Sequence, residues 1–297
     1  MKLLKSIAIV AIVAAVATAP TIVATPRYAP AATYLRIQSW NARHMGWSGQ
    51  QDWAGYAAQC WNQFGSSSSS TNGLDLIALQ EVMYDTSVTS FISALQTVSG
   101  YSWAHTTTAA IGRTSYKERY SIVYRTDRVT LLNSYVYNDV GDKFEREPQI
   151  AQFRVTATGA DVFFINWHTI FGTTAQRQQE INDIVAVFNS VQNSTANDQD
   201  VILLGDHNAD GNSSWWNNLK NTANVNPAVT YKVNDLTSIN SSCNFANAYD
   251  HFWMQIAYVT EFSSAGRDYI SNMCTFYNGL SDHAPVWLKL YSSGDDD

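Results

Sequence analysis

The sequence V-I-L-L-G-D-H-N-A-D occupies residues 201–210 and begins with four large apolar residues. A short, continuously apolar run that ends at a glycine is typical of a strand covered on both faces. Asp206 and Asn208 follow at the carboxyl end of this predicted strand. In open α/β sheets, ligand sites form at the carboxyl ends of the strands. The segment therefore predicts a buried strand that carries part of a functional site.

The same pattern recurs elsewhere in the chain. Three other apolar segments run directly into polar residues, which are Asn41, Gln80-Glu81 and His168. Two Asp-His pairs follow near the C-terminus, Asp250-His251 and Asp282-His283. Carboxylate and amide oxygens suit Mg²⁺, Mn²⁺ or Ca²⁺. A neutral histidine can take a proton from water, and a charged one can protonate a leaving oxygen.

Each of these residues also fits a simpler role. An aspartate after a strand, such as Asp206, often only caps a helix or forms a turn. Glu81 could be a surface residue at a strand end, and an isolated histidine such as His105 is more often packed in a core. The combination of histidines and carboxylates at several strand ends nevertheless favours phosphodiester hydrolysis assisted by a metal.

Apolar periodicity predicts a layered α/β sandwich. Apolar residues spaced as on one helical face predict helices over 50–64, 86–99 and 174–191. Short apolar or alternating runs predict strands over 34–40, 74–79, 121–124, 129–137, 150–155, 162–167, 201–204, 252–259 and 285–291. Mixed elements in this number are typical of layered sheets covered by helices. No internal repeat or long linker divides the chain, so we expect residues 32–297 to form one domain.

Composition limits the ways in which this chain could bind nucleic acid. Of its 297 residues, 45% are hydrophobic, and the formal net charge is −7 with a pI near 5.3. Such a charge argues against binding by bulk electrostatics, which needs clustered lysine and arginine. Binding to a polyanion would require a local basic patch and would be strongly sensitive to salt. The candidates for that patch are Arg113, Lys117, Arg119, Arg125, Arg128 and Arg146.

The N-terminus has the features of a secretion signal. Lys2 and Lys5 precede an apolar stretch from Ser6 to Ala19, and Ala29-Pro30-Ala31 fits a cleavage site. We therefore expect residues 1–31 to be removed and the protein to be secreted. Of the three cysteines, Cys60 lies on the apolar face of a predicted helix. This leaves Cys243 and Cys274 as the favoured disulfide pair, a bond that spacing alone does not prove.

Longer motifs resemble one enzyme family. W-N-A-R at 40–43, L-Q-E-V at 79–82, G-D-H-N-A-D at 205–210 and S-D-H-A-P-V at 281–286 are similar to the marks of the endonuclease/exonuclease/phosphatase superfamily. G-R-T-S-Y-K-E-R-Y at 112–120 resembles its deoxyribonuclease I branch, with support from R-E-P at 146–148 and N-A-Y-D at 247–250. The resemblance covers residues 34 to 290. It implies a four-layer α/β/β/α sandwich of two mixed, mostly antiparallel sheets flanked by helices.

The resemblance also implies a role for individual residues. His168 and His283 match the catalytic histidines, and Glu118 and Asp250 match their supporting carboxylates. Glu81 matches the main metal ligand. The rest of the metal and phosphate environment would comprise Asn41, Asp206, Asn208 and Asp282. Contacts to phosphate or to the DNA groove would come from Arg43, Arg113, Tyr116 and Arg146. The implied cofactor is Mg²⁺ or Mn²⁺, with Ca²⁺ as a further cation, and the implied substrate is DNA.

Two departures from the family pattern affect the expected DNA contacts. Met83 stands where members often carry an arginine, which argues against tight insertion into the minor groove. His207 stands where phenylalanine is usual, and a changed packing residue is the favoured interpretation over an added metal or phosphate contact. The disulfide of animal members is absent, since Gly211 occupies one of its positions. A monomer without stable membrane association after signal removal is the family default.

Other functions on the same fold remain open at this point. A sphingomyelinase-like phosphodiesterase or the nuclease subunit of a genotoxin shares the general motifs, whereas the Y-K-E-R-Y segment favours the nuclease branch. A non-catalytic DNA- or protein-binding member would have lost at least one catalytic group. All the expected histidines and carboxylates are present in the sequence, which argues against that alternative.

Overall fold

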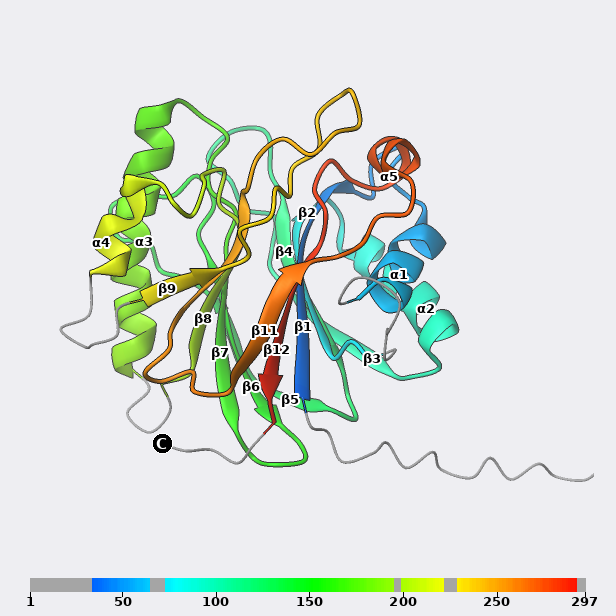
Figure 1. Ribbon diagram of the computed structural model, residues 1–297, viewed down its shortest axis with the longest axis horizontal. Coiled ribbons are helices and arrows are strands. Elements are labelled where there is room, and N and C mark those ends of the chain that lie inside the picture. The colour runs from blue at the N-terminus through cyan, green and yellow to red at the C-terminus, as the bar shows by residue number, and fades with distance from the viewer. Residues whose placement is uncertain (1–33, 65–72, 195–198, 222–228, 293–297) are drawn as a thin grey trace, which may run out of the picture. The chain divides into compact units, whose positions relative to one another are not determined.

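Two stacked six-stranded sheets form the centre of the molecule, as the computed structural model shows for residues 34–64, 73–194, 199–221 and 229–292 (Figure 1). The predicted signal sequence, residues 1–31, lies outside these described residues. In spatial order, the first sheet contains β11 (Phe262–Arg267), β12 (Val286–Tyr291), β1 (Tyr34–Met45), β2 (Leu76–Val82), β4 (Arg119–Arg125) and β3 (Trp103–Thr107). The second contains β5 (Val129–Val136), β6 (Gln149–Val155), β7 (Asp161–Asn166), β8 (Val201–Asp206), β10 (Asp250–Gln255) and β9 (Val229–Lys232).

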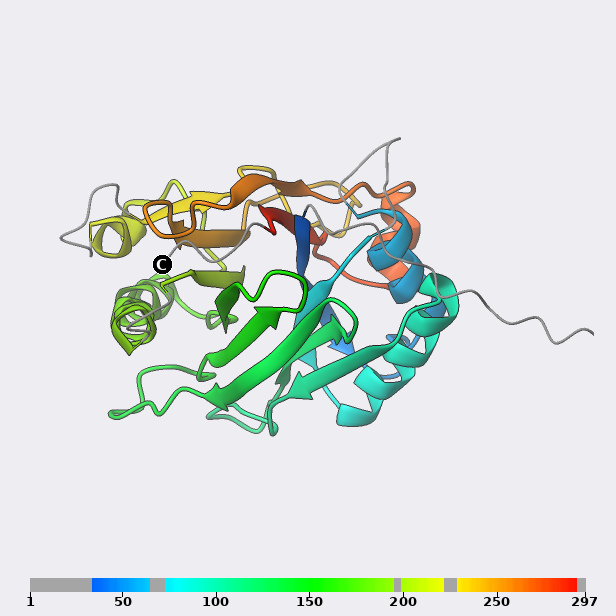
Figure 2. The same cartoon turned by 90° about the horizontal axis from the view of Figure 1, so that it is seen from below.

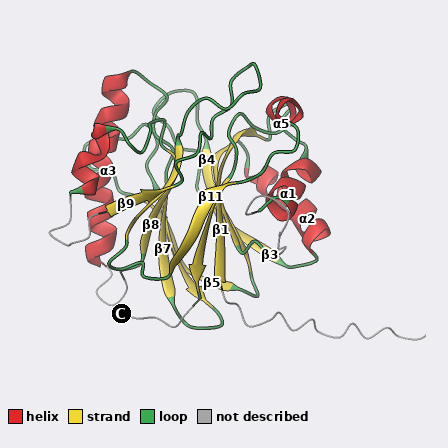
Figure 3. Cartoon of the chain, in the orientation of Figure 1, coloured by secondary structure: helices red, strands yellow, loops and turns green. Residues whose placement is uncertain are grey.

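Helices cover the outer face of each sheet (Figures 2 and 3). The first sheet is covered by α1 (Trp53–Asn62), α2 (Asp85–Ser99) and α5 (Met273–Gly279). The second is covered by α3 (Thr174–Ser194), the short helix η1 (Ser214–Trp216) and α4 (Asn217–Lys220). The predicted four-layer α/β/β/α sandwich is therefore confirmed.

Three apolar cores hold the four layers together. The central core lies between the sheets, where Ile37 and Leu76 of the first face Phe153 and Leu204 of the second. One outer core packs α1 and α2 on the first sheet, and the other packs α3 on the second. Because β7 and β8 are covered on both faces, their apolar side chains are buried whichever way they point, which explains their continuous apolar runs.

Strand direction brings the polar strand ends to one edge of the sandwich. β1 pairs parallel with β2, and β7 pairs parallel with β8, so all four strands end at the upper edge in Figure 1. Their antiparallel neighbours β4, β10 and β12 begin at that same edge. Residues that follow the parallel strands therefore meet residues that precede the antiparallel ones.

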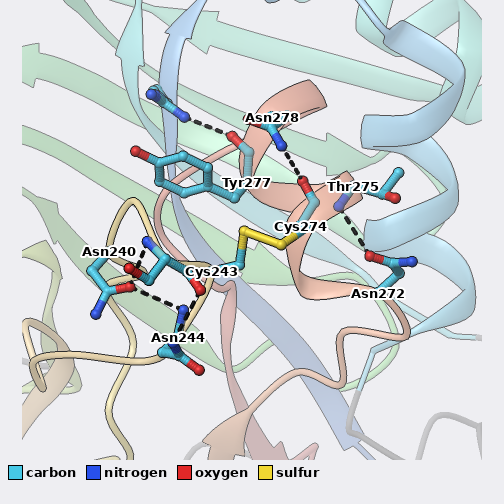
Figure 4. Close-up of a disulfide and its surroundings, with 10 residues drawn as sticks. Asn240, Cys243, Asn244, Asn272, Cys274, Thr275, Tyr277 and Asn278 are labelled. Carbon is cyan, nitrogen blue, oxygen red and sulfur yellow. Dashed lines mark hydrogen bonds between the residues drawn. A yellow bond between two sulfur atoms is a disulfide. The ribbon is translucent and has the colours of Figure 1, made fainter.

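A disulfide joins Cys243, in the loop before β10, to Cys274 in α5 (Figure 4). The Cα atoms of the two residues lie 5.0 Å apart. Asn240 and Asn244 hydrogen-bond around the turn that carries Cys243, and the Asn272 side chain caps the first turn of α5. Cys60 is a buried free thiol on α1. The pairing expected from the sequence is thus present in the structure.

Candidate active site

A cavity of about 680 Å³ opens at this edge of the sandwich. Its lining includes many of the predicted site residues, which are Glu81, Tyr116, Arg146, His168, Asp206, Asn208, Asp282 and His283. Glu118 and Asp250 do not line it; both are fully buried, each bonded to one histidine ring. The structure therefore brings together the two histidines and four of the five predicted metal ligands.

The first histidine is fixed by a buried carboxylate. His168 Nδ1 donates to Glu118 Oε1 over 2.8 Å, and its backbone N–H donates to the Tyr120 hydroxyl over 3.0 Å. Glu118 is also 3.2 Å from Arg146 Nε and accepts from the Tyr116 hydroxyl. Burial alone would raise the pKa of Glu118, but the charges of His168 and Arg146 outweigh it and lower that pKa. Glu118 can therefore act as a charged partner that orients the ring.

The second histidine has an equivalent support. His283 Nδ1 donates to Asp250 Oδ2 over 2.8 Å, and the Trp40 indole donates to the His283 carbonyl over 2.7 Å. Burial opposes protonation of this ring, but the charges of Asp206 and Asp250 outweigh burial and raise the pKa of His283 well above its usual value. Each imidazole thus has Nδ1 bound to a carboxylate and Nε2 left to face the cavity.

Both Nε2 atoms face the same carboxylate, Asp206. Asp206 Oδ2 lies 3.6 Å from Nε2 of His168 and 3.4 Å from Nε2 of His283. Burial would raise the pKa of Asp206, but the charges of His283 and His168 outweigh it and lower that pKa. The side-chain amide of Asn41 donates to the same oxygen over 2.9 Å. Asp206 therefore occupies the centre of the site, between the two rings.

Glu81 lies beside this centre and is held by three N–H groups. Its Oε1 accepts from the Asn41 amide over 2.9 Å, and its Oε2 accepts from the backbone N–H of His44 over 3.0 Å. The His44 ring comes within 3.3 Å of the same oxygen through Nε2. Sequence reasoning missed His44 because it has no motif partner nearby in the chain. It reaches Glu81 because the backbone turns sharply at the end of β1.

Backbone strain is concentrated at these positions. Arg43, His44, Glu81 and Asn208 have φ values of 42°, 53°, 56° and 47°, in the left-handed region that residues other than glycine rarely adopt. Such conformations cost about 1–3 kcal/mol each and persist only where the surrounding structure enforces them. Their clustering around Glu81 and Asp206 is independent evidence that this edge of the sandwich is a functional site.

The residues predicted to contact phosphate lie in different surroundings. Arg43 stacks over the Tyr277 ring and lies 3.7 Å from Asp282, whose side chain is half-exposed. Arg146 is buried and donates to the backbone carbonyls of His168 and Thr169. Arg113 is not part of the cavity lining and forms ion pairs with Asp139 and Asp142.

Most of the residues expected to form a basic patch are separated from one another or paired with carboxylates. Arg125 and Arg128 lie beside Asp75, a fully buried residue before β2 at the opposite edge of the sheets. Arg146 and Arg113 are paired with carboxylates, as described above. Four of the six candidates are therefore dispersed and paired with carboxylates, whereas the side chains of Lys117 and Arg119 donate to the backbone carbonyls of Gly112 and Thr108. The sequence suggested a patch because these residues are close in the chain, but β4 runs the length of the sheet and separates them.

His207 and Asn208 complete the segment after β8. His207 is buried among Trp167, Trp216 and His251, and burial lowers its pKa well below the usual value. Its packing role, favoured from the sequence, agrees with these contacts. The Asn208 amide donates to the carbonyl of Thr169 over 2.9 Å and lies 3.4 Å from Nε2 of His168.

The donor atoms fit a hard divalent cation. Glu81, Glu118 and His168 each offer one ligand atom, all within 4.8 Å of one another, and so do Asp206, Asp250 and His283. Glu118 and Asp250 already bond to the histidines, so Glu81 and Asp206 are the carboxylates of these two groups that line the cavity. Asn41 joins these two carboxylates through its N–H groups, while its amide oxygen accepts from Arg43. A third acidic group, Asp139, Asp142 and Glu147, includes both ion-pair partners of Arg113.

The fold and this site define a class of protein. An endonuclease/exonuclease/phosphatase family protein from Bacteroides thetaiotaomicron superposes with a TM-score of 0.63 at 16% identity, covering 87% of this chain and 98% of that structure. Such a likeness shows that the chain has the endonuclease/exonuclease/phosphatase fold. No family model matches the sequence.

Proteins of similar sequence identify the family within this class. The chain is 30% identical over 238 residues to deoxyribonuclease-1 of Oryctolagus cuniculus, covering 73% of this chain and 81% of the relative. It is 27% identical over 270 residues to a deoxyribonuclease of Thioalkalivibrio sp. (strain K90mix), covering 86% and 70%. Matches to rodent deoxyribonuclease-1-like 1 proteins span less than half the length of those relatives. The chain belongs to the deoxyribonuclease I family.

Proposed function

We propose that the protein is a secreted endodeoxyribonuclease that hydrolyses DNA phosphodiester bonds with the help of a divalent cation. One observation carries the proposal: two histidines, each held by a buried carboxylate, have their Nε2 atoms 3.6 and 3.4 Å from the same oxygen, Asp206 Oδ2. A scissile phosphate placed there would have an imidazole on either side. Membership of the deoxyribonuclease I family supports DNA as the substrate.

The two rings have complementary tasks in such a reaction. One imidazole accepts a proton from the attacking water through Nε2, and the other donates a proton from Nε2 to the leaving oxygen. Glu118 and Asp250 fix the opposite nitrogen of each ring, so that Nε2 is always the atom presented to the cavity. Arg146 stabilises the charge on Glu118. Both carboxylates therefore act as positioning residues.

Glu81 is the residue best placed to hold Mg²⁺ or Mn²⁺, with Asp206 and Asp282 on the same cavity wall. The bound cation would neutralise negative charge that builds up on the phosphate oxygens. Asn41 and His44 keep the Glu81 carboxylate in one orientation from behind. Asn208 lies beside the His168 ring, where its amide can donate to a phosphate oxygen.

Secretion is part of the proposal. It is supported by the charged and apolar N-terminal segment, residues 1–31, and by the disulfide between Cys243 and Cys274, a bond typical of oxidising compartments. Within the described part of the chain, no helix is long and apolar enough to cross a membrane. We expect the mature chain, residues 32–297, to act as one monomeric domain.

Nicking of supercoiled plasmid tests the function. We expect cleavage in Mg²⁺ or Mn²⁺, with and without added Ca²⁺, and none in EDTA. His168→Ala and His283→Ala should each lose about two to four orders of magnitude in rate, the usual contribution of a general acid or base. His105→Ala is the matched control, because His105 lies on β3 and does not line the cavity.

Two results would contradict the proposal. Intact plasmid with every cation tried would exclude the nuclease, and release of phosphocholine from sphingomyelin would then identify a phospholipase. Cleavage that persists in both histidine variants would show that the reaction takes place somewhere other than between His168 and His283.

A further inference from the structure

One aromatic side chain at the mouth of the cavity is almost entirely exposed. Phe171 has an exposed fraction of 82%, the highest among the large hydrophobic residues of the described part of the chain. It lines the same cavity as His168, Asp206 and His283. Leaving a phenylalanine in water forgoes the stabilisation that burial of its ring would provide. An exposed ring beside a catalytic site is therefore a candidate contact for a ligand.

The segment that carries Phe171 is firmly attached to the protein. The N–H of Thr169 donates to the Asp206 carbonyl over 3.0 Å, and the N–H of Ile170 donates to the Glu180 carboxylate over 2.8 Å. After the ring, Thr173 hydrogen-bonds to Gln176 at the start of α3. Phe171 is thus presented on an anchored loop, and little additional ordering is needed when a ligand binds.

The cavity offers few free positive charges to a polyanion. Arg146 is the one arginine or lysine among its described lining residues, and it is buried against Glu118. Arg43 nearby is close to Asp282. Met83 is buried, so it cannot reach into a DNA groove. Within the cavity, free positive charge therefore contributes little to the affinity for DNA, and another kind of contact can add to it.

We propose that Phe171 stacks on an unpaired nucleobase next to the scissile phosphate, which makes single-stranded DNA a better substrate than duplex DNA. This inference rests on the proposed nuclease function. Aromatic rings bind single strands because every base has a face on which they can stack. In a duplex, the neighbouring base pairs cover those faces, so an exposed ring has only edges to contact.

The surroundings of Phe171 favour a base over a lipid surface. The next residues are Gly172, Thr173 and Thr174, and the remaining lining of the cavity is mostly polar. A membrane-binding surface needs several neighbouring apolar side chains that can be buried together. One ring on a polar rim matches the size of a single base.

The test compares Phe171→Ala with the wild-type enzyme on a labelled single-stranded oligonucleotide and on the matching duplex. Loss of one stacked base should lower kcat/KM on the single strand about tenfold, mainly through KM, and change the duplex by less than about twofold. Phe171→Trp should restore the single-strand value, whereas Phe171→Leu, which is apolar but has no ring, should not. Tyr135→Ala removes another exposed aromatic side chain, on β5, and serves as the control.

Binding gives a second readout that does not depend on turnover. In the His168→Ala background, a single strand containing 2-aminopurine should lose its fluorescence change when Phe171 is also replaced by alanine. If Phe171→Ala lowers kcat/KM equally on the two substrates, or more on the duplex, the proposal is overturned. Such a result would indicate that the ring inserts between base pairs. A Phe171→Ala protein that binds sphingomyelin vesicles less tightly than the wild type but cleaves DNA equally well would also overturn the proposal. A wild-type enzyme that cleaves neither DNA would instead refute the nuclease function itself.

Discussion

Single side chains determine the protonation chemistry of the site. Burial opposes protonation of His168, but the charge of Glu118 outweighs it and raises the pKa of His168 above its usual value. The pKa of Glu118 is lowered in turn, because His168 and Arg146 stabilise its charge against burial. The pair is therefore charged in the folded state over a range of pH in which the same groups in the unfolded chain would be partly neutral.

We expect Glu118→Gln to lower the free energy of unfolding by about 3 kcal/mol near pH 6, since it removes one partner of a buried ion pair. The stabilisation from His168 is complete below its unfolded pKa of about 6.5 and is lost as pH rises through its raised folded pKa. The stabilisation from Glu118 is present above its unfolded pKa of about 4.3 and is lost as pH falls through its lowered folded pKa. The effect should therefore be larger at about pH 6 than at about pH 9.

Urea denaturation at the two pH values measures this difference. Asp142→Asn is the control, because Asp142 forms an ion pair with Arg113 at the surface, with its side chain 78% exposed. Such a pair contributes about 0–1 kcal/mol. An equal loss at both pH values in Glu118→Gln would indicate that the His168–Glu118 charge pair does not contribute to stability.

The close contact of β7 and β8 places His168 and Asp206 side by side. Gly205 has a φ of 139°, and a Cβ atom built on it would lie 1.8 Å from the carbonyl oxygen of Trp167. No side chain fits between these two strands. Glycine at this position therefore allows the two strand ends to approach each other, with His168 after one strand and Asp206 at the end of the other.

We expect Gly205→Ala to lower the free energy of unfolding by about 2–5 kcal/mol, because a backbone clash adds to the strain of the positive φ. The rate of DNA cleavage should also fall, because the added methyl group forces β7 and β8 apart. Gly279→Ala, at the end of α5, meets no atom within 4 Å and is the control. Thermal unfolding and plasmid nicking measure the two effects. A Gly205→Ala protein as stable and active as the wild type would disprove this role of the glycine.

The elements with a clear apolar pattern could be predicted from the sequence, and those without one could not. α1, α2 and α3 were predicted because each buries one face at helical spacing. β3, β9 and α5 were missed because they are short, and β11 was missed because its composition, F-S-S-A-G-R, is mostly polar. β10 starts at Asp250 and not at Phe252, so the residue that supports His283 is already within the strand.

The site was predictable in its composition but not in its geometry. Strand ends indicated which residues meet, because parallel strands end at one edge. The contact of His44 with Glu81 joins residues 37 positions apart and depends on a left-handed turn that has no sequence signal. The dispersal of the arginines depends on the length of β4, which begins directly after Glu118 and has Arg125 at its far end.

The whole molecule carries a net charge of −7 and has few free cations at the cavity. We expect its affinity for DNA to depend only weakly on salt, with a slope of log K against log salt between about −1 and −3. This revises the strong salt dependence expected from the sequence. Fluorescence anisotropy with the His283→Ala protein at several salt concentrations measures the slope. A slope steeper than about −5 would show that a basic surface contacts the DNA after all.

The disulfide between Cys243 and Cys274 encloses β10 of one sheet and β11 of the other. A protease that cuts the chain in the turn between these strands would produce an N-terminal piece with His168 and a C-terminal piece with His283. The two pieces would remain covalently attached through the disulfide, and each would stay paired within the sheets. A nicked protein would thus keep His168 and His283 in one covalently joined molecule until a reductant separated the two pieces.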